Sequence, residues 1–157
     1  MVLKIDDWVF QVDLEKTKEH SSFVSSQHCT CGFCENYYRT ILAVCPGLKD
    51  FLDQFSILVD APSEMYPIDP AWYLSGYRVF GRVLQFGLAP MMVDGVPITA
   101  EPVDNTNFLL EVGELELPWV MEEPWEDVIS PANEPEFLEN MYRKLSRRNP
   151  DTGIFCS

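Results

Sequence analysis

Two hydrophobic periods divide this chain of 157 residues into a helical part and a part made of strands. Between residues 34 and 55, apolar side chains recur every three or four positions, which is the spacing of one helical face: Cys34, Tyr38, Ile41, Cys45, Leu48, Leu52 and Phe55. Pro46-Gly47 interrupts this stripe, because proline lacks an amide donor and disfavours helix at the residue before it. We therefore expect two helices, at roughly 34–44 and 47–56.

Strand-like patterns follow in the second half of the chain. Four segments alternate or form short apolar runs: 77–84, 90–98, 108–112 and 114–120. Asp94-Gly95 suits a tight hairpin turn, and Pro118 favours a sheet edge or a bulge for the last of these segments. A short first strand is also expected at 8–12.

Two further helices are expected near the ends of the chain. Asp13 is placed to cap a helix that runs toward Phe23, after which a polar, serine-rich stretch is expected to be a loop. Residues 60–72 carry three prolines and predict an irregular connection. Asn133 and Glu136 resemble a capping box, which predicts a helix over 134–146.

Together these elements predict an α+β fold. The largely antiparallel sheet is expected from residues 77–120, covered on one face by the helices at 34–56 and 134–146, because a helical stripe needs an apolar surface to cover it. A chain of this length buries roughly 70% of its unfolded surface in one core. We expect a single domain over residues 1–157, with 149–157 as a loose tail.

Acidic residues dominate one part of the sequence. The net charge is −14, and residues 83–142 contain thirteen Asp and Glu but no Lys, Arg or His. This field opposes nucleic acids and anionic membranes. A solvated acidic surface is the simplest interpretation, and a face that docks a basic protein partner or mimics nucleic acid is the alternative. The chain has no apolar run long enough for a membrane span and no signal-peptide pattern at its start. With an odd number of cysteines, it is expected in a reducing cytoplasm.

Three closely spaced cysteines are the one cluster with the character of metal ligands: Cys29, Cys31 and Cys34. Their thiolates can converge on one ion, so the segment is a candidate for a structural zinc site. The fourth ligand is expected to be the adjacent His28, or else His20 or Cys156. The competing interpretations are packing thiols in a loop, a redox or disulfide pair, and a cysteine nucleophile with a histidine base.

Other candidate groups are weaker. Four carboxylates in a proline-rich loop could hold a hard cation or form an acid/base pair: Glu122, Glu123, Glu126 and Asp127. Their spacing matches no calcium loop, so a solvated acidic loop is the better interpretation. Trp119 and Trp125 could form an aromatic platform or close a core edge. There is no phosphate loop, dinucleotide fingerprint, zinc-protease helix or serine-hydrolase elbow.

The segments His28-Cys-Thr-Cys-Gly-Phe-Cys-Glu-Asn-Tyr-Tyr, Cys45-Pro-Gly-Leu-Lys-Asp-Phe-Leu and Glu116-Leu-Pro-Trp-Val resemble a family of small, functionally unassigned proteins of Firmicutes. The resemblance implies a bacterial cytoplasmic domain and transfers no activity, cofactor or site residue. From the residues themselves we expect a non-enzymatic, acidic interaction or regulatory domain. The alternative is a metal-binding or redox protein that uses the cysteine cluster.

Overall fold

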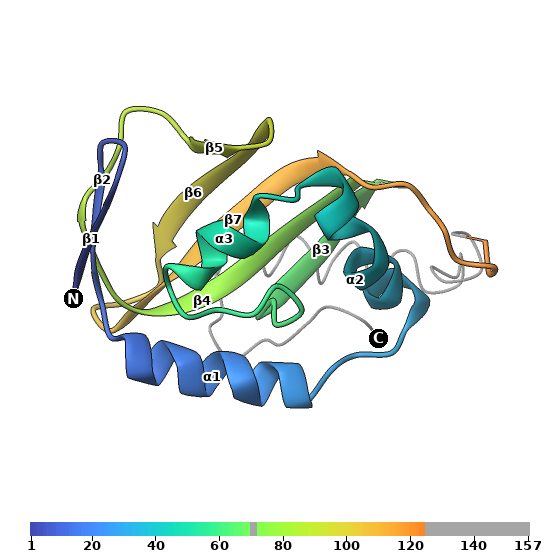
Figure 1. Cartoon of the computed structure of the whole chain (residues 1–157), viewed down its shortest axis with the longest axis horizontal. Coiled ribbons are helices and arrows are strands. Elements are labelled where there is room, and N and C mark those ends of the chain that lie inside the picture. The colour runs from blue at the N-terminus through green and yellow to red at the C-terminus, as the bar shows by residue number, and fades with distance from the viewer. Residues whose placement is uncertain (70–71, 125–157) are drawn as a thin grey trace.

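The computed structural model describes residues 1–69 and 72–124 and has a mixed α+β fold (Figure 1). Its strands are β1 (Val2–Ile5), β2 (Trp8–Val12), β3 (Glu64–Asp69), β4 (Trp72–Gln85), β5 (Met91–Val93), β6 (Val96–Pro102) and β7 (Asn107–Glu116). They form a seven-stranded sheet in the order β1-β2-β4-β7-β6-β5, with β3 paired to β4 off this path. Every pairing is antiparallel, which confirms the predicted fold class.

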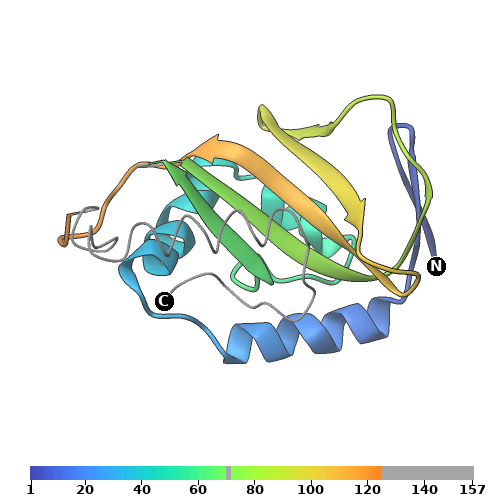
Figure 2. The same cartoon turned by 180° about the vertical axis from the view of Figure 1, so that it is seen from behind.

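Three helices lie in the described part of the chain: α1 (Leu14–Ser26), α2 (Gly32–Val44) and α3 (Leu48–Asp53). Helices α2 and α3 cover one face of the sheet, and α1 runs alongside it (Figures 1 and 2). The break between α2 and α3 falls at Pro46-Gly47, so the prediction of two helices is confirmed. The helix expected at 134–146 and the tail at 149–157 lie outside the described residues.

The core lies between the sheet and α2 and α3, and aromatic side chains dominate it. Phe10 of β2 stacks on Phe108 of β7 with ring centroids 5.3 Å apart, and it meets Phe55 edge-on at 5.6 Å. Tyr37 of α2 and Tyr77 of β4 are fully buried and joined by a 2.7 Å hydrogen bond between their hydroxyls. Helix α2 is therefore held to the central strand by both packing and hydrogen bonding.

The serine-rich stretch was predicted to be a loop, and this prediction is wrong, because α1 continues through Ser26. Ser21 is buried and its hydroxyl accepts a 2.9 Å hydrogen bond from the amide of Leu58. Ser25 donates a 3.2 Å hydrogen bond to Asp60. Serine is a weak helix former by itself, but hydroxyls that satisfy a neighbouring segment compensate for that weakness.

The prediction of an irregular connection at residues 60–72 holds for 60–63 and is wrong for 64–69, where β3 pairs with β4. Pro67 is compatible with this strand, since among the described residues β3 has β4 as its one neighbour and a proline without an amide is tolerated at such an edge. The two strands expected at 108–112 and 114–120 are a single strand, β7, which ends before Pro118. Strand β1, which was not predicted, pairs with β2.

The hairpin predicted at Asp94-Gly95 is confirmed. Val93 and Val96 are paired across a two-residue turn in which Asp94 has φ 51° and Gly95 has φ 80°. Positive φ at both central residues is the geometry for which Asp-Gly is favoured. In addition, a carboxylate oxygen of Asp94 accepts a 2.6 Å hydrogen bond from the amide of Gly47, which ties the hairpin to the start of α3. No described helix is long and apolar enough to cross a membrane.

Candidate metal and thiol centre

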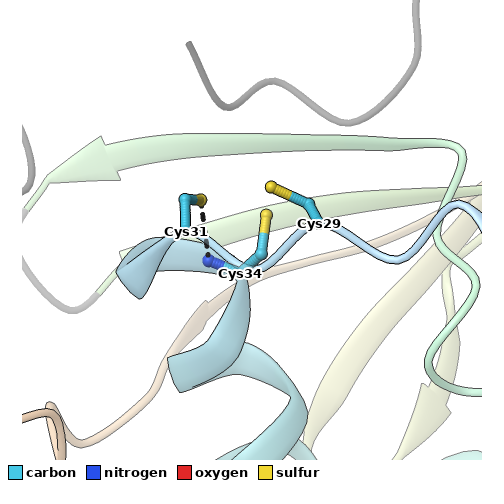
Figure 3. A group of neighbouring side chains, drawn as sticks. All are labelled: Cys29, Cys31 and Cys34. Carbon is cyan, nitrogen blue, oxygen red and sulfur yellow. Dashed lines mark hydrogen bonds between the residues drawn. The ribbon is translucent and has the colours of Figure 1, made fainter.

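The three clustered cysteines meet where a loop enters α2. Cys29 lies in the loop, Cys31 is the N-cap residue of α2, and Cys34 lies in its first turn. Their sulfur atoms all lie within 4.8 Å of one another (Figure 3). Cys29 and Cys31 are partly exposed, whereas Cys34 is fully buried. The group is therefore close enough to hold a metal ion, as the spacing of the sequence predicted.

Local geometry explains why the helix begins at this point. Cys31 has an extended backbone, and its sulfur accepts a 3.5 Å hydrogen bond from the amide of Cys34, in the manner of an N-cap side chain. Phe33, between the two cysteines, stacks on Tyr73 of β4 with ring centroids 4.4 Å apart, and its carbonyl accepts a 3.1 Å hydrogen bond from the Tyr73 hydroxyl. The first turn is thereby fixed to the sheet, and the cysteines with it.

The two cysteines of α2 differ in acidity. A hydrogen bond from the Cys34 thiol is the largest influence on Cys31 and lowers its pKa to about 7, although burial acts in the opposite direction. The same interaction, together with burial, raises the pKa of Cys34 well above its ordinary value. Of the two residues, Cys31 is thus the one that loses its proton near neutral pH, whereas Cys34 stays a thiol.

The oxidation states of the cysteines are not the same. Cys31, Cys34 and Cys45 are free thiols. Cys29 is held in a disulfide bond, so it becomes a thiolate only after that bond is reduced. Cys45 is remote from the group: its thiol donates a 3.4 Å hydrogen bond to the carbonyl of Val93, and burial raises its pKa to about 11.

Neither predicted histidine lies within the group of candidate ligand atoms, which among the described residues contains the three cysteines. His28 stacks on Tyr38 with ring centroids 3.8 Å apart, and its Nε2 lies 3.8 Å from a carboxylate oxygen of Asp60. His20 is hydrogen-bonded through Nε2 to Ser63 at 3.2 Å. A cysteine nucleophile would therefore find no histidine base within this group. Cys156 lies outside the described residues.

The sequence interpretation overlooked the surroundings of His28. Tyr38 follows Cys34 by one helical turn, and its hydroxyl and Nε2 of His28 are both buried without a hydrogen-bond partner among the described residues. Tyr38 and Asp60 also line a cavity of about 260 Å³ between α2, α3 and residues 58–60. The four-residue spacing of Cys34 and Tyr38 is the one sequence feature that places this ring near the cysteines.

An acidic segment is attached to the same helix. The side chain of Asn36, which is fully buried in α2, donates to the carbonyl of Pro118 at 3.1 Å and accepts from the amide of Val120 at 2.8 Å. Four exposed acids lie on either side of this anchor: Glu114, Glu116, Glu122 and Glu123. The indole of Trp119 donates to the carbonyl of Glu123 at 2.8 Å. Trp125, Glu126 and Asp127 lie outside the described residues, so the predicted platform and cation loop stay predictions.

No family model matches the chain. No curated protein matches it, and no solved structure does. The resemblance to small proteins of Firmicutes therefore stays a prediction, and the functional argument depends on the geometry of the residues described above.

Proposed function

We propose that, once Cys29 is reduced, the protein binds one Zn²⁺ ion through Cys29, Cys31 and Cys34. The observation that carries the proposal is the mutual distance of the three sulfurs, within 4.8 Å. In a tetrahedral site with Zn–S bonds of about 2.3 Å, two sulfurs lie about 3.8 Å apart. Small rotations of these side chains are therefore enough to bring them to bonding distance.

The protonation of the cluster suits metal binding. The lowered pKa of Cys31 provides one thiolate near neutral pH, and binding of the ion displaces the proton of buried Cys34. The fourth position is open among the described residues. His28 directly precedes Cys29 and is our proposed fourth ligand, which it becomes by turning away from Tyr38. A site closed by three sulfurs and an imidazole is structural rather than catalytic.

The direct test is elemental analysis of reduced protein purified without an affinity tag. One zinc per chain is expected, and Cys31→Ser should lose the metal and lower the melting temperature. Cys45→Ser is the matched control, because this free thiol lies outside the cluster. His28→Ala should weaken zinc binding without abolishing it. Metal-free protein whose melting temperature is insensitive to a chelator would refute the proposal.

A second candidate function is docking of a basic protein partner on the acidic segment. The exposure of Glu114, Glu116, Glu122 and Glu123 favours it, and none of the four forms an ion pair within residues 1–69 and 72–124. Opposite charges steer association and are screened by salt. A specific partner should be captured by the wild-type chain at low salt, and lost at high salt. It should also be lost when the four glutamates are replaced by glutamine; capture that persists in this variant would contradict the candidate.

A further inference from the structure

Cys31 and Cys34 form a Cys-x-x-Cys pair whose two members differ in accessibility. Cys31 is partly exposed at the N-cap of a helix of thirteen residues, and Cys34 is fully buried one turn later. Both are free thiols, and their sulfurs lie within 4.8 Å of each other. An external molecule can thus reach Cys31, whereas the buried Cys34 is close to the sulfurs of Cys31 and Cys29 and is shielded from solvent.

From this geometry we propose that Cys31 and Cys34 are a thiol–disulfide exchange centre, which reduces small, exposed disulfides such as oxidised glutathione and becomes a protein disulfide itself. Cys31 is the attacking thiol, and Cys34 is the resolving thiol. The proposal concerns the metal-free chain and does not depend on zinc binding at the same cluster.

The first step forms a mixed disulfide. The Cys31 thiolate attacks one sulfur of the small disulfide, whose S–S bond breaks as the new bond to Cys31 forms. The first small thiolate leaves and takes up a proton from solvent. The amide of Cys34, which donates to the sulfur of Cys31, stabilises the attacking thiolate.

The second step closes the protein disulfide. The Cys34 thiol transfers its proton to solvent and attacks the sulfur of Cys31, so a Cys31–Cys34 bond forms and the second small thiolate leaves with a proton taken up from solvent. The protein dithiol has then lost two electrons, and the small disulfide has become two thiols.

The surroundings of the two cysteines limit which disulfides can react with them. Phe33 is 2% exposed and stacks on Tyr73, so the first turn of α2 is anchored while the cysteine side chains rotate. The partly exposed position of Cys31 admits an extended or small disulfide but not one buried in a folded protein. The substrate class is therefore a low-molecular-weight disulfide or one in a flexible peptide.

The experiment uses the full chain, reduced, treated with a chelator and then incubated with oxidised glutathione. Peptide mapping of the wild type should show a Cys31–Cys34 link. Cys34→Ser should instead retain one glutathione on Cys31. Cys31→Ser should form neither the protein disulfide nor this glutathione adduct. Cys45→Ser is the control and should behave as the wild type. Circular dichroism checks that each variant is folded, with Cys34→Ala as the substitute if Cys34→Ser is not.

Three outcomes would overturn the inference: a stable glutathione adduct on wild-type Cys31, an adduct on Cys34 in its place, or no reaction at either residue. Repeating the assay in a Cys29→Ser background excludes exchange with the disulfide at Cys29 as the source of the link. Zinc content is measured separately. If the chain forms the Cys31–Cys34 link but binds no zinc, this inference stands and the metal proposal fails. If it binds zinc but does not form the link, the metal proposal stands and this inference fails.

Discussion

Tyr37 provides the sharpest test of how α2, and with it the cysteine cluster, is held on the sheet. Its hydroxyl lies 2.9 Å from the hydroxyl of Ser75 and 2.7 Å from that of Tyr77. Tyr77 donates to the carbonyl of Val59 at 2.7 Å, so it must accept from Tyr37. Tyr37 then accepts from Ser75, which gives a directed chain of three hydrogen bonds in the core.

Replacing Tyr37 with phenylalanine keeps the ring and breaks two of these bonds. The Ser75 hydroxyl, which is fully buried, is left without an acceptor. A buried group without its partner costs about 1–3 kcal/mol, so we expect Tyr37→Phe to lower the free energy of unfolding by about 2 kcal/mol. For a domain of this size, that corresponds to a fall in melting temperature of about 4–8 °C.

The adjacent Tyr38 is the matched control, because its buried hydroxyl has no hydrogen-bond partner among the described residues. Tyr38→Phe should leave stability unchanged within about 0.5 kcal/mol. Urea unfolding followed by tryptophan fluorescence measures both variants. Adding Ser75→Ala to Tyr37→Phe should recover part of the loss, because removal of both partners leaves nothing unsatisfied. Equal losses in Tyr37→Phe and Tyr38→Phe would refute the hydrogen-bond argument.

Three further predictions concern other parts of the fold. Gly81→Ala should cost at least about 3 kcal/mol or prevent folding, since Gly81 has φ +149° and the new Cβ would collide with the backbone of β2. Gly95 has φ +80° with open space around it, so Gly95→Ala should cost about 1 kcal/mol in the same urea assay. Asp94→Ala removes the acceptor of the Gly47 amide and should cost about 1 kcal/mol, and Asp94→Asn should cost less because it retains an acceptor. Burial, and secondarily Arg78, lowers the pKa of His20. The contribution of His20 to stability is therefore present above the ordinary histidine pKa and is lost as pH falls through the lowered pKa. A His20→Gln variant should flatten the acid side of a plot of unfolding free energy against pH, and an unchanged plot would count against the assignment.

Local sequence patterns were sufficient for several elements. The apolar stripe over 34–55, with its break at Pro46-Gly47, predicted two helices, and the structure has them. Asp13 caps α1 by accepting from the amide of Lys16, and Asp94-Gly95 makes the predicted turn. These features depend on residues within about four positions of one another, so the information they need is contained in a short stretch of sequence.

Tertiary contacts decided the elements that the sequence patterns missed. Strand β3 exists because β4 offers it a pairing edge, despite Pro67. The end of α1 is helical because Ser21 and Ser25 find partners in the segment at 57–60. Propensities of serine and proline describe a residue without its distant neighbours, so a hydrogen bond across more than thirty positions of the chain can override them.

In the candidate site, too, some features follow from the sequence and others from tertiary packing. The spacing of Cys29, Cys31 and Cys34 by itself predicted that their sulfurs converge, because residues so close in sequence have few ways to separate. Sequence proximity also predicted that His28 would join the cysteines, but its ring stacks on Tyr38 instead. The difference in exposure between Cys31 and Cys34 was also beyond the sequence, since burial of Cys34 depends on how Phe33 docks against Tyr73 of a strand forty residues away. Spacing determined which atoms meet, and packing against the sheet determined which of them solvent can reach.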